Sequence, residues 1–370
     1  MAPRRQVPTT RVVGRWSNTS RACRTRIRRR TIDGVKVLVT GGTGFVGSHA
    51  ALALQASGHD VRLLVRRPDQ VSLTFAPHPG GPPRDIVTGD VLDAAAVEAG
   101  IAGCDAVVHA AAVFSLDARR SQEVLETNAR AAELVLGRAV DAGCDPVVHV
   151  SSTVALARFA GSGPDLPLGD MTLPYSLSKI ASEQVARELQ DLGHPVVTVY
   201  PGSVYGPHDP YAGDQNVRLA WVVRGLFPLW PTGSLHVVDV RETAAVISAV
   251  TQAGRGPRRY VVPGHAVTGR ELYRAVSTVV GRRRPHVSMS PTATRIAVGS
   301  MEPLQKVLPA GWHYPADREG AELSLRSTTF DTSPAERDLG VTPRPFEETI
   351  RDTIAWLVEA GRLPAKYHPA

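Results

Sequence analysis

Three polar side chains in the middle of the chain have the types and spacing of a proton-transfer site. Tyr175 and Lys179 are four residues apart in a segment expected to be helical, so both side chains can approach the same ligand. A tyrosine ordinarily has a pKa of about 10, and a neighbouring lysine cation is expected to lower it. Ser152 ends the strand before this helix, where its hydroxyl can donate a hydrogen bond to a carbonyl oxygen. Such residues could exchange a proton with a carbonyl or an alcohol.

A glycine-rich turn supplies the second part of such a site. The apolar run 36–40 leads into this turn, and an amphipathic segment follows it. Gly41 allows a tight turn, Gly44 lets the backbone approach a pyrophosphate, and Gly47 lets the new helix pack closely on the sheet. The amides and the positive dipole at the start of that helix then hold phosphate. The predicted dinucleotide pocket consists of Gly41, Thr43, Gly44, Phe45, Val46 and Gly47.

Segments typical of strands and helices alternate from this turn to residue 200. Strands are expected at 60–66, 85–88, 105–110, 146–150 and 195–200, helices at 45–57, 93–103, 120–143 and 175–192, and a surface loop at 68–83. The alternation predicts an α/β fold, a doubly wound parallel sheet of the Rossmann type, which binds ligands at the carboxyl ends of its strands. We expect this domain to span 35–206. A smaller substrate-binding lobe, intertwined with it as one structural unit, is expected over 207–363.

The net charge of +7 is concentrated at the N-terminus. Residues 1–34 contain ten Arg and one acidic residue and carry +9, whereas the rest of the 370-residue chain sums to −2. We expect this leader to be disordered; a non-functional extension or upstream start, a transit-peptide-like segment and an RNA- or membrane-surface-binding tail are the alternatives. The nearly neutral body predicts no nucleic-acid partner, and no stretch is apolar enough for a membrane span. Three widely spaced cysteines predict no metal site and a cytoplasmic protein.

The end of the second expected strand bears on the choice of dinucleotide. NAD sites place an acidic residue there for the ribose 2′-hydroxyl, whereas the 2′-phosphate of NADP needs a cation. This chain has Arg66 and Arg67 there, with no acidic residue before Asp69. We therefore expect NADP(H), with Arg66 as the main contact and Arg67 either assisting or solvated, and NAD(H) stays open as the alternative.

The chain resembles the extended short-chain dehydrogenase/reductase superfamily, in particular its NAD(P)-dependent epimerase/dehydratase and dihydroflavonol-reductase-like members. The likeness covers roughly Val35 to Leu363. Its motifs occur in the family order: the glycine turn, Gly89-Asp90-Val91-Leu92-Asp93, His109-Ala110-Ala111-Ala112, Asn128, Ser151-Ser152, Tyr175-x-x-x-Lys179, Tyr200-Pro201-Gly202-Ser203-Val204-Tyr205-Gly206-Pro207 and Val237-Val238-Asp239-Val240.

The resemblance implies a role for each motif. Tyr175 would be the general acid in reduction and the base in oxidation, while Lys179 would hold the nicotinamide ribose and tune Tyr175. Ser152 would polarise the carbonyl, with Thr153 as an adjacent candidate, and Asn128 would be structural. The remaining contacts to the cofactor would come from Asp90 and Val91 beside the adenine, from Ala110, Ala111 and Ala112, and from the backbone of Pro201 to Val204 near the carboxamide.

These residues favour hydride transfer between NADP(H) and a ketone or secondary alcohol, with a small molecule as substrate. One alternative is a sugar-nucleotide epimerase or dehydratase with tightly bound NAD, although such dehydratases usually have an acidic pair just after the catalytic hydroxyl and this chain has none. A second is a cofactor-sensing protein without turnover, which would not need Ser152, Tyr175 and Lys179 together. The apolar residues Leu226, Phe227, Leu229 and Trp230 would suit an apolar, ring-bearing substrate or else pack the smaller lobe.

The resemblance also bears on assembly. The expected helix 120–143 could form a dimer bundle, as it does in many relatives, so a homodimer is one open possibility for this chain.

Overall fold

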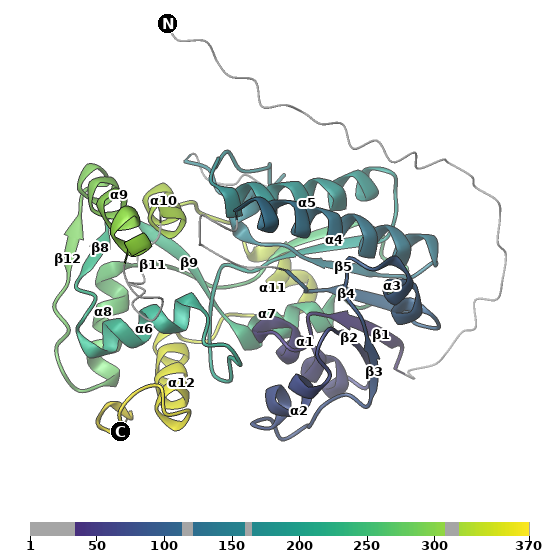
Figure 1. Cartoon of the computed structure of the whole chain (residues 1–370), viewed down its shortest axis with the longest axis horizontal. Coiled ribbons are helices and arrows are strands. Elements are labelled where there is room, and N and C mark those ends of the chain that lie inside the picture. Colours follow the sequence, from purple (N-terminus) through teal and green to yellow (C-terminus); the bar gives the residue numbers. More distant parts are fainter. Residues whose placement is uncertain (1–33, 113–120, 160–164, 308–317, 370) are drawn as a thin grey trace, which may run out of the picture. The chain divides into compact units, whose positions relative to one another are not determined.

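The computed structural model describes residues 34–369 except 113–120, 160–164 and 308–317, so the expected leader lies almost wholly outside the described residues. A seven-stranded sheet of parallel strands forms the centre (Figure 1). Its strand order is β10-β6-β5-β4-β1-β2-β3. The strands are β1 (Lys36–Thr40), β2 (Asp60–Val65), β3 (Asp85–Thr88), β4 (Ala106–His109), β5 (Val147–Val150), β6 (Val196–Tyr200) and β10 (Arg258–Val261). The predicted doubly wound α/β fold is confirmed.

Helices cover both faces of this sheet, as Figure 1 shows. The inner strands β1, β4, β5 and β6 are largely apolar because both of their faces are buried, whereas the edge strand β3 alternates between half-buried and exposed residues. Leu38, Val107 and Val147 pack against the helices of one face, and the neighbouring Val37, Val108 and Val148 pack in the core of the other. The first face carries α3 (Ala94–Ile101), α4 (Ser121–Asp141) and α5 (Pro174–Asp191); the second carries α1 (Phe45–Ala56), α7 (Val240–Ala249) and α11 (Ser333–Leu339).

One segment expected to be a loop contains a helix. α2 spans Asp69–Phe75, inside the stretch 68–83. Val71 and Phe75, four residues apart, are both buried on one side of α2, and this contact with the core stabilises the short helix. The proline- and glycine-rich composition that indicated a loop begins only at Pro77.

The chain returns to the sheet after residue 206. β10 pairs in parallel with β6 at the edge of the sheet, and α7 packs against α1 beneath it. The central sheet is therefore completed by residues from within the span expected for the smaller lobe. The motif alternation ends near residue 200, and the four residues of β10 are too few and too mixed in polarity to have indicated a strand.

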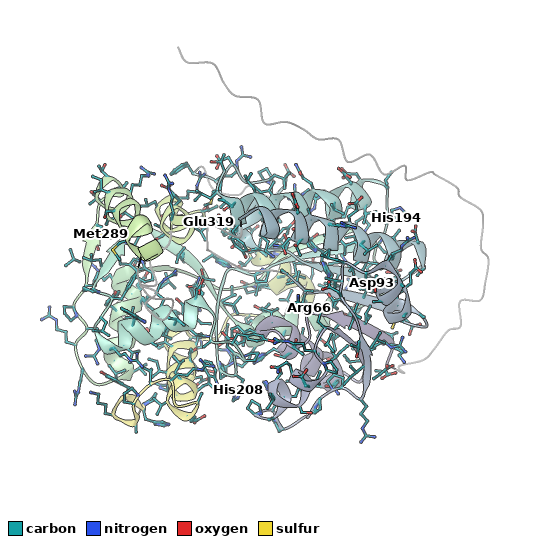
Figure 2. The ribbon with its side chains drawn as sticks, viewed as in Figure 1. Arg66, Asp93, His194, His208, Met289 and Glu319 are labelled. Carbon is teal, nitrogen blue, oxygen red and sulfur yellow. The ribbon has the colours of Figure 1, made fainter. Side chains whose placement is uncertain are left out.

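The smaller lobe is built on two short sheets. One has the order β11-β9-β7 and the other pairs β12 with β8. Buried aromatic side chains of Phe227, Trp230 and Tyr273 pack between these sheets and the helices, and Met289 (Figure 2) ends β12. The elements are β7 (Ser203–Tyr205), β8 (Leu229–Pro231), β9 (Ser234–Asp239), β11 (His265–Thr268), β12 (Val287–Met289), α6 (Asp214–Arg224), α8 (Gly269–Val279), α9 (Pro291–Val307), α10 (Arg318–Arg326) and α12 (Phe346–Glu359).

Within the part of the chain that the structure describes, no helix combines the length and the apolar composition that crossing a membrane requires.

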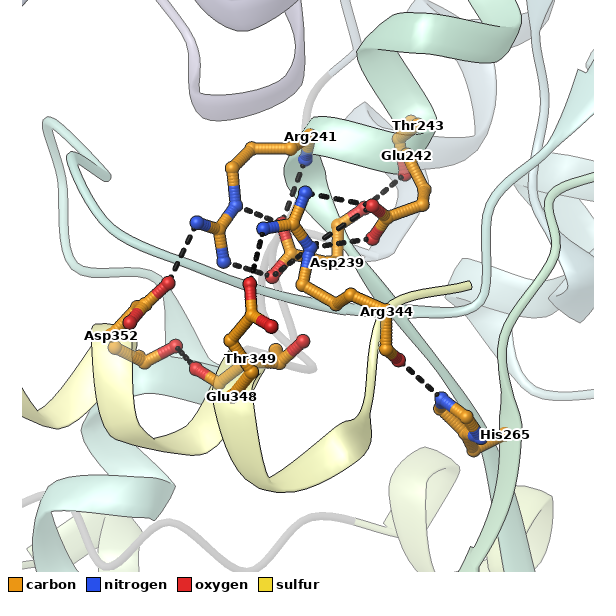
Figure 3. A network of polar contacts seen from close by, with 10 residues as sticks. Asp239, Arg241, Glu242, Thr243, His265, Arg344, Glu348, Thr349 and Asp352 are labelled. Atoms are coloured by element: carbon orange, nitrogen blue, oxygen red, sulfur yellow. Dashed lines mark hydrogen bonds and ion pairs between the residues drawn. The ribbon is translucent and has the colours of Figure 1, made fainter. Parts of the chain in front are cut away.

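A network of ion pairs joins the start of α7 to α12 (Figure 3). The Asp239 carboxylate is 1% exposed and accepts hydrogen bonds from the Arg241 side chain at 2.7 and 2.9 Å, with Arg344 Nε at 3.5 Å. Arg241 also donates to Asp352 at 2.7 Å. Burial of the Asp239 carboxylate opposes its charge, but Arg241 and then Arg344 outweigh burial and hold its pKa below the usual range. The charge of Asp239 therefore anchors the lobe to the sheet.

Asp239→Asn removes this charge but keeps an oxygen that can accept from the Arg241 amide at the helix start. Among the residues that the structure describes, Arg241 then keeps only the half-exposed Asp352 and Arg344 keeps Glu242, so we expect the free energy of unfolding to fall by about 2 kcal/mol in urea titrations at neutral pH. Because folding lowers the pKa of Asp239, the stabilisation is present above the unfolded pKa and is lost as the pH falls through the folded pKa. The difference between variant and wild type is thus expected to shrink in acid.

Asp352→Asn is the matched control, since the Asp352 side chain is 33% exposed and solvent weakens its pairing. An equal loss of stability in the two variants would contradict the role given to Asp239.

Candidate active site

The glycine turn brings three backbone segments into close contact. Gly41 has φ +73°, and a Cβ there would lie 2.6 Å from the amide nitrogen of Ala111. A Cβ on Gly47 would lie 2.1 Å from the carbonyl oxygen of Gly41. Side chains at these two positions would push β1, β4 and α1 apart. The close packing predicted for Gly47 is thus present, with the turn itself as the neighbour.

The first turn of α1 faces the cleft with its amides. Gly44 is the N-cap residue and has no side chain to accept from them, and the first turn contains no acidic residue. Gly41, Gly44, Phe45, Val46 and Gly47 all line the cleft. Amides at a helix start, with the positive end of the dipole, form a site for an anion, so these residues fit the pyrophosphate of a dinucleotide.

The end of β4 is fixed beside this turn by buried polar contacts. Thr40 Oγ1 and His109 Nδ1 are 2.8 Å apart, and the amide of Ala111 donates to Thr40 Oγ1 at 3.3 Å. β1 and β4 are neighbours, with Thr40 opposite His109. Ala110 and Ala112 consequently line the cleft next to the glycines.

Ser152 and Thr153 reach the same cleft from the end of β5. Ser152 caps the short 3-10 helix η2 (Thr153–Leu156), with its Oγ accepting from the Val154 amide at 3.2 Å. The amide of Thr153 donates to the carbonyl of Pro201 at 2.9 Å, which ties this turn to the segment after β6. Gly202 and Val204 of that segment also line the cleft.

α5 presents Tyr175 to the cleft and buries Lys179 behind it. Lys179 is 7% exposed, and its Nζ lies 5.9 Å from the centre of the Tyr175 ring. Ser178 Oγ donates to the Tyr175 carbonyl at 2.7 Å, and Asn128 of α4 donates to Ser178 Oγ at 3.2 Å. Asn128 thus braces α5, in keeping with the structural role expected for it.

The pKa of Tyr175 differs from the sequence-based expectation. Lys179 was expected to lower it, but burial first and the Glu319 carboxylate second raise the pKa of Tyr175 above its usual range. Burial also lowers the pKa of Lys179, to about 8. The physical reason for the difference is that burial opposes both the phenolate and the ammonium, and spacing along a helix contains no information about burial.

The structure places the other expected cofactor residues around the cleft without making them part of its wall. Arg66 (Figure 2) is 72% exposed at the end of β2, with its Nη1 3.9 Å from Asp90 Oδ2. The cleft itself has a volume of about 650 Å³. The expected residues that do not line it are Thr43, Arg66, Asp90, Val91, Ala111, Lys179 and Pro201.

A second, apolar cavity of about 350 Å³ adjoins the cleft. Arg218 and Gly320 line both spaces, so the two are neighbours. Its wall contains Phe227, Leu229, Trp230, Pro231, Leu235, Met289, Thr294, Ala297, Val298, Ser300, Met301, Gly320, Ala321 and Ser324. Phe227 and Trp230 are buried in the lobe core and also line this cavity, whereas Leu226 is exposed and lies outside it. Their packing of the smaller lobe is thus observed, and their contact with a substrate stays a prediction.

Sequence reasoning missed Glu319 and the rest of the α10 wall. Glu319 Oε1 accepts from the amide of Tyr175 at 2.7 Å, although 144 residues separate the two. No recognisable motif surrounds Glu319. An acidic residue in the first turn, as here, is ordinary at the start of a helix. The apolar residues of α9 were equally without a distinguishing pattern.

Known proteins resemble this chain over most of its length. A ketoreductase of Stigmatella aurantiaca acting on 4-hydroxy-2-methyl-3-oxo-4-farnesyl-3,4-dihydroquinoline-1-oxide is 28% identical over 89% of this chain and 98% of its own. A dTDP-glucose 4,6-dehydratase of Streptomyces antibioticus is also 28% identical, over 91% of this chain and 97% of its own. The solved structure of a dTDP-glucose 4,6-dehydratase from Streptomyces venezuelae with NAD bound is 25% identical, covers 90% of this chain and 99% of its own, and has a TM-score of 0.69.

The family model for the NAD dependent epimerase/dehydratase family matches residues 37–262, which is more than half of the chain. This match spans the glycine turn, Ser152, Tyr175 and Lys179. The chain therefore belongs to the NAD-dependent epimerase/dehydratase family and is an NAD(P)-dependent oxidoreductase, as the resemblance of its motifs predicted.

Proposed function

We propose that this protein is an NADP(H)-dependent reductase that transfers hydride between the dinucleotide and a ketone or secondary alcohol with an apolar, ring-bearing body. One observation carries the proposal. Ser152 and Tyr175 line the same cleft as the glycine turn, and a cavity with a largely apolar wall lies next to that cleft.

The roles of the three polar residues follow from their positions. A substrate carbonyl in the cleft would accept hydrogen bonds from Ser152 and Tyr175, which stabilise the negative charge that develops on its oxygen. The dinucleotide, when bound, supplies or accepts the hydride. Tyr175 is held protonated by its surroundings and therefore acts first as the donor, passing its proton to the oxygen in reduction. The ammonium of Lys179 then stabilises the phenolate that remains, and it would hold the nicotinamide ribose.

The apolar cavity supports an apolar substrate over a sugar nucleotide. Phe227, Trp230 and Val298 offer contacts to a hydrocarbon ring or chain. The polar residues of the wall are few, namely Arg218, Thr294, Ser300 and Ser324, so a nucleotide diphosphate would lose more hydration there than a hydrocarbon body does. Thr153 and Val154 stand just after Ser152, where dehydratases of the resembled family usually carry acidic residues. The equal identities to a ketoreductase and a dehydratase leave this decision to the site.

Arg66 is proposed to bind the 2′-phosphate of NADP(H). Its distant and exposed pairing with Asp90 is weakened by solvent, so the guanidinium is available to a phosphate. Arg66→Ala is expected to raise the dissociation constant of NADPH by roughly 10- to 100-fold, the worth of a hydrogen-bonded charge pair. NADH binding should change less than about threefold on the same scale.

Fluorescence titration of both dinucleotides measures this, with Arg67→Ala as the neighbouring exposed control. A wild-type preference for NADH that Arg66→Ala leaves unchanged would refute the choice of NADP(H).

The reaction itself is tested with Tyr175→Phe and a panel of ring-bearing ketones with NADPH. Loss of the proton donor is expected to reduce kcat by about 100-fold or more, while NADPH binding stays close to wild type. Tyr260→Phe is the control, because the Tyr260 hydroxyl contacts Asp338 outside the cleft. Substantial ketone reduction by Tyr175→Phe would contradict the assignment of Tyr175 as the proton donor. Dinucleotide that stays bound through purification, without ketone reduction by the wild type, would instead favour an epimerase or dehydratase.

A further inference from the structure

The catalytic helix α5 begins without a cap of its own. Leu173 occupies the N-cap position and has no side-chain acceptor, and Pro174 has no amide hydrogen. The first amides of the helix that have a hydrogen to donate are therefore those of Tyr175 and Ser176. In most helices an N-cap side chain accepts from the amides at these second and third positions, and leaving them unpaired costs about 1 kcal/mol.

A carboxylate from the other end of the chain takes this place. Glu319 Oε1 accepts from the Tyr175 amide at 2.7 Å and from the Ser176 amide at 3.3 Å, and Oε2 accepts from Ser176 Oγ at 3.4 Å. Figure 2 shows Glu319 on α10 beside the start of α5. Glu319 also lines the cleft, as do Tyr175 and Ser176.

The helix that carries Glu319 is itself anchored on both sides. Glu322 accepts from Arg295 of α9 at 2.6 Å, and Arg326 pairs with Asp170 in the segment before α5. These contacts fix α10 relative to the start of α5. The Glu319 carboxylate therefore reaches α5 from a helix that has side-chain contacts of its own to α9 and to the segment before α5.

We propose that Glu319 is a positioning residue for the reaction, whose carboxylate caps α5 from the substrate lobe, fixes the direction of the Tyr175 hydroxyl and places a negative charge next to it. This inference rests on the proposed function of Tyr175 as proton donor. It assigns Glu319 a role in the placement of Tyr175 and in the pH dependence of catalysis, not in contact with the reacting atoms.

The charge of Glu319 bears on the pH range in which Tyr175 is protonated. A carboxylate at the helix start offsets the positive end of the α5 dipole, which would otherwise stabilise a phenolate at Tyr175. Together with burial, which is the larger cause, Glu319 raises the pKa of Tyr175. Reduction needs the phenol of Tyr175 and oxidation needs its phenolate. Glu319 therefore keeps the phenol over a wider pH range, and the phenolate forms only at higher pH.

The same helix links this cap to substrate binding. Gly320, Ala321 and Ser324 of α10 line the apolar cavity, and Gly320 also lines the cleft. A substrate body that fills the cavity therefore packs against the helix that holds the start of α5. Loss of the cap is expected to lower kcat more than it raises KM, because the substrate still has the cavity wall to bind.

The test compares Glu319→Gln and Glu319→Ala in the full chain. Gln keeps an oxygen for the two amides but removes the charge, so kcat for ketone reduction at neutral pH should stay within about threefold of wild type. The rise of alcohol oxidation with pH, measured with NADP⁺, should move to lower pH by about one unit. Ala removes the cap as well and should lower kcat by about tenfold, with KM changed less than about threefold, if misplacement of Tyr175 costs roughly 1.4 kcal/mol.

Glu188→Gln is the matched control, since it removes a carboxylate from α5 itself, and the Glu188 side chain is exposed and lines neither cavity. It should leave both kcat and the pH profile unchanged. An oxidation profile in Glu319→Gln that coincides with that of wild type would overturn the electrostatic part, and equal kcat values for Glu319→Ala and wild type would overturn the positioning part.

A readout that does not need turnover separates this inference from the proposed function. The ultraviolet difference between each protein and its Tyr175→Phe partner, followed with pH in the NADP⁺ complex, reports ionisation of Tyr175 alone. Earlier ionisation in Glu319→Gln without ketone reduction by any variant would support Glu319 and refute the reductase. Unchanged ionisation with active reductase would refute Glu319 and leave the reductase in place.

Discussion

A close crossing of backbones at the carboxyl edge of the central sheet sets the geometry of the site. Gly41 turns off β1 in the left-handed region directly against Ala111, and the helix α1 begins so near that Gly47 has no room for a side chain. This contact places the start of α1, with its free amides, next to the ends of β4 and β5. The dinucleotide cleft, Ser152 and Tyr175 are all arranged around this crossing.

Burial, more than spacing, decides the charges at the site. Lys179 and Tyr175 share a helix face, yet a buried ammonium and a buried phenolate are both unfavourable, so the pKa of Lys179 falls to about 8 and that of Tyr175 rises. The protonated phenol is the form that a reductase needs. A Lys four residues from a Tyr does not by itself decide the protonation state of the phenol, which the surroundings of the pair determine.

The smaller lobe contributes to the sheet, the substrate cavity and the catalytic helix at once. β10 completes the sheet, Asp239 and Arg241 tie the start of α7 to α12, and α10 walls the apolar cavity while capping α5. These contacts explain why the residues after 206 interleave with the Rossmann part. The helix α10 contacts both the apolar cavity and the start of α5. Substitutions on this helix can therefore change substrate binding and proton transfer together.

The sequence alone determined the local features of this protein. The strands from β1 to β6 and the Rossmann fold follow from short apolar runs and glycine spacing, which act over a few residues. The family follows from the resemblance of the motifs that these segments carry, and the same motifs predict Ser152, Tyr175 and Lys179 as site residues. The helix α2 was not predicted, because the prolines and glycines beside it indicated a loop. Val71 and Phe75 stabilise this short helix by packing in the core.

Only the tertiary structure decided what depends on segments far apart. The pairing of β10 with β6, the cavity that Trp230 and Val298 line together, the pKa of Tyr175 and the cap that Glu319 provides across 144 residues arise from contacts and burial in the folded chain. Such contacts leave no periodic pattern in the sequence, because either partner alone is an ordinary residue of its own helix or strand.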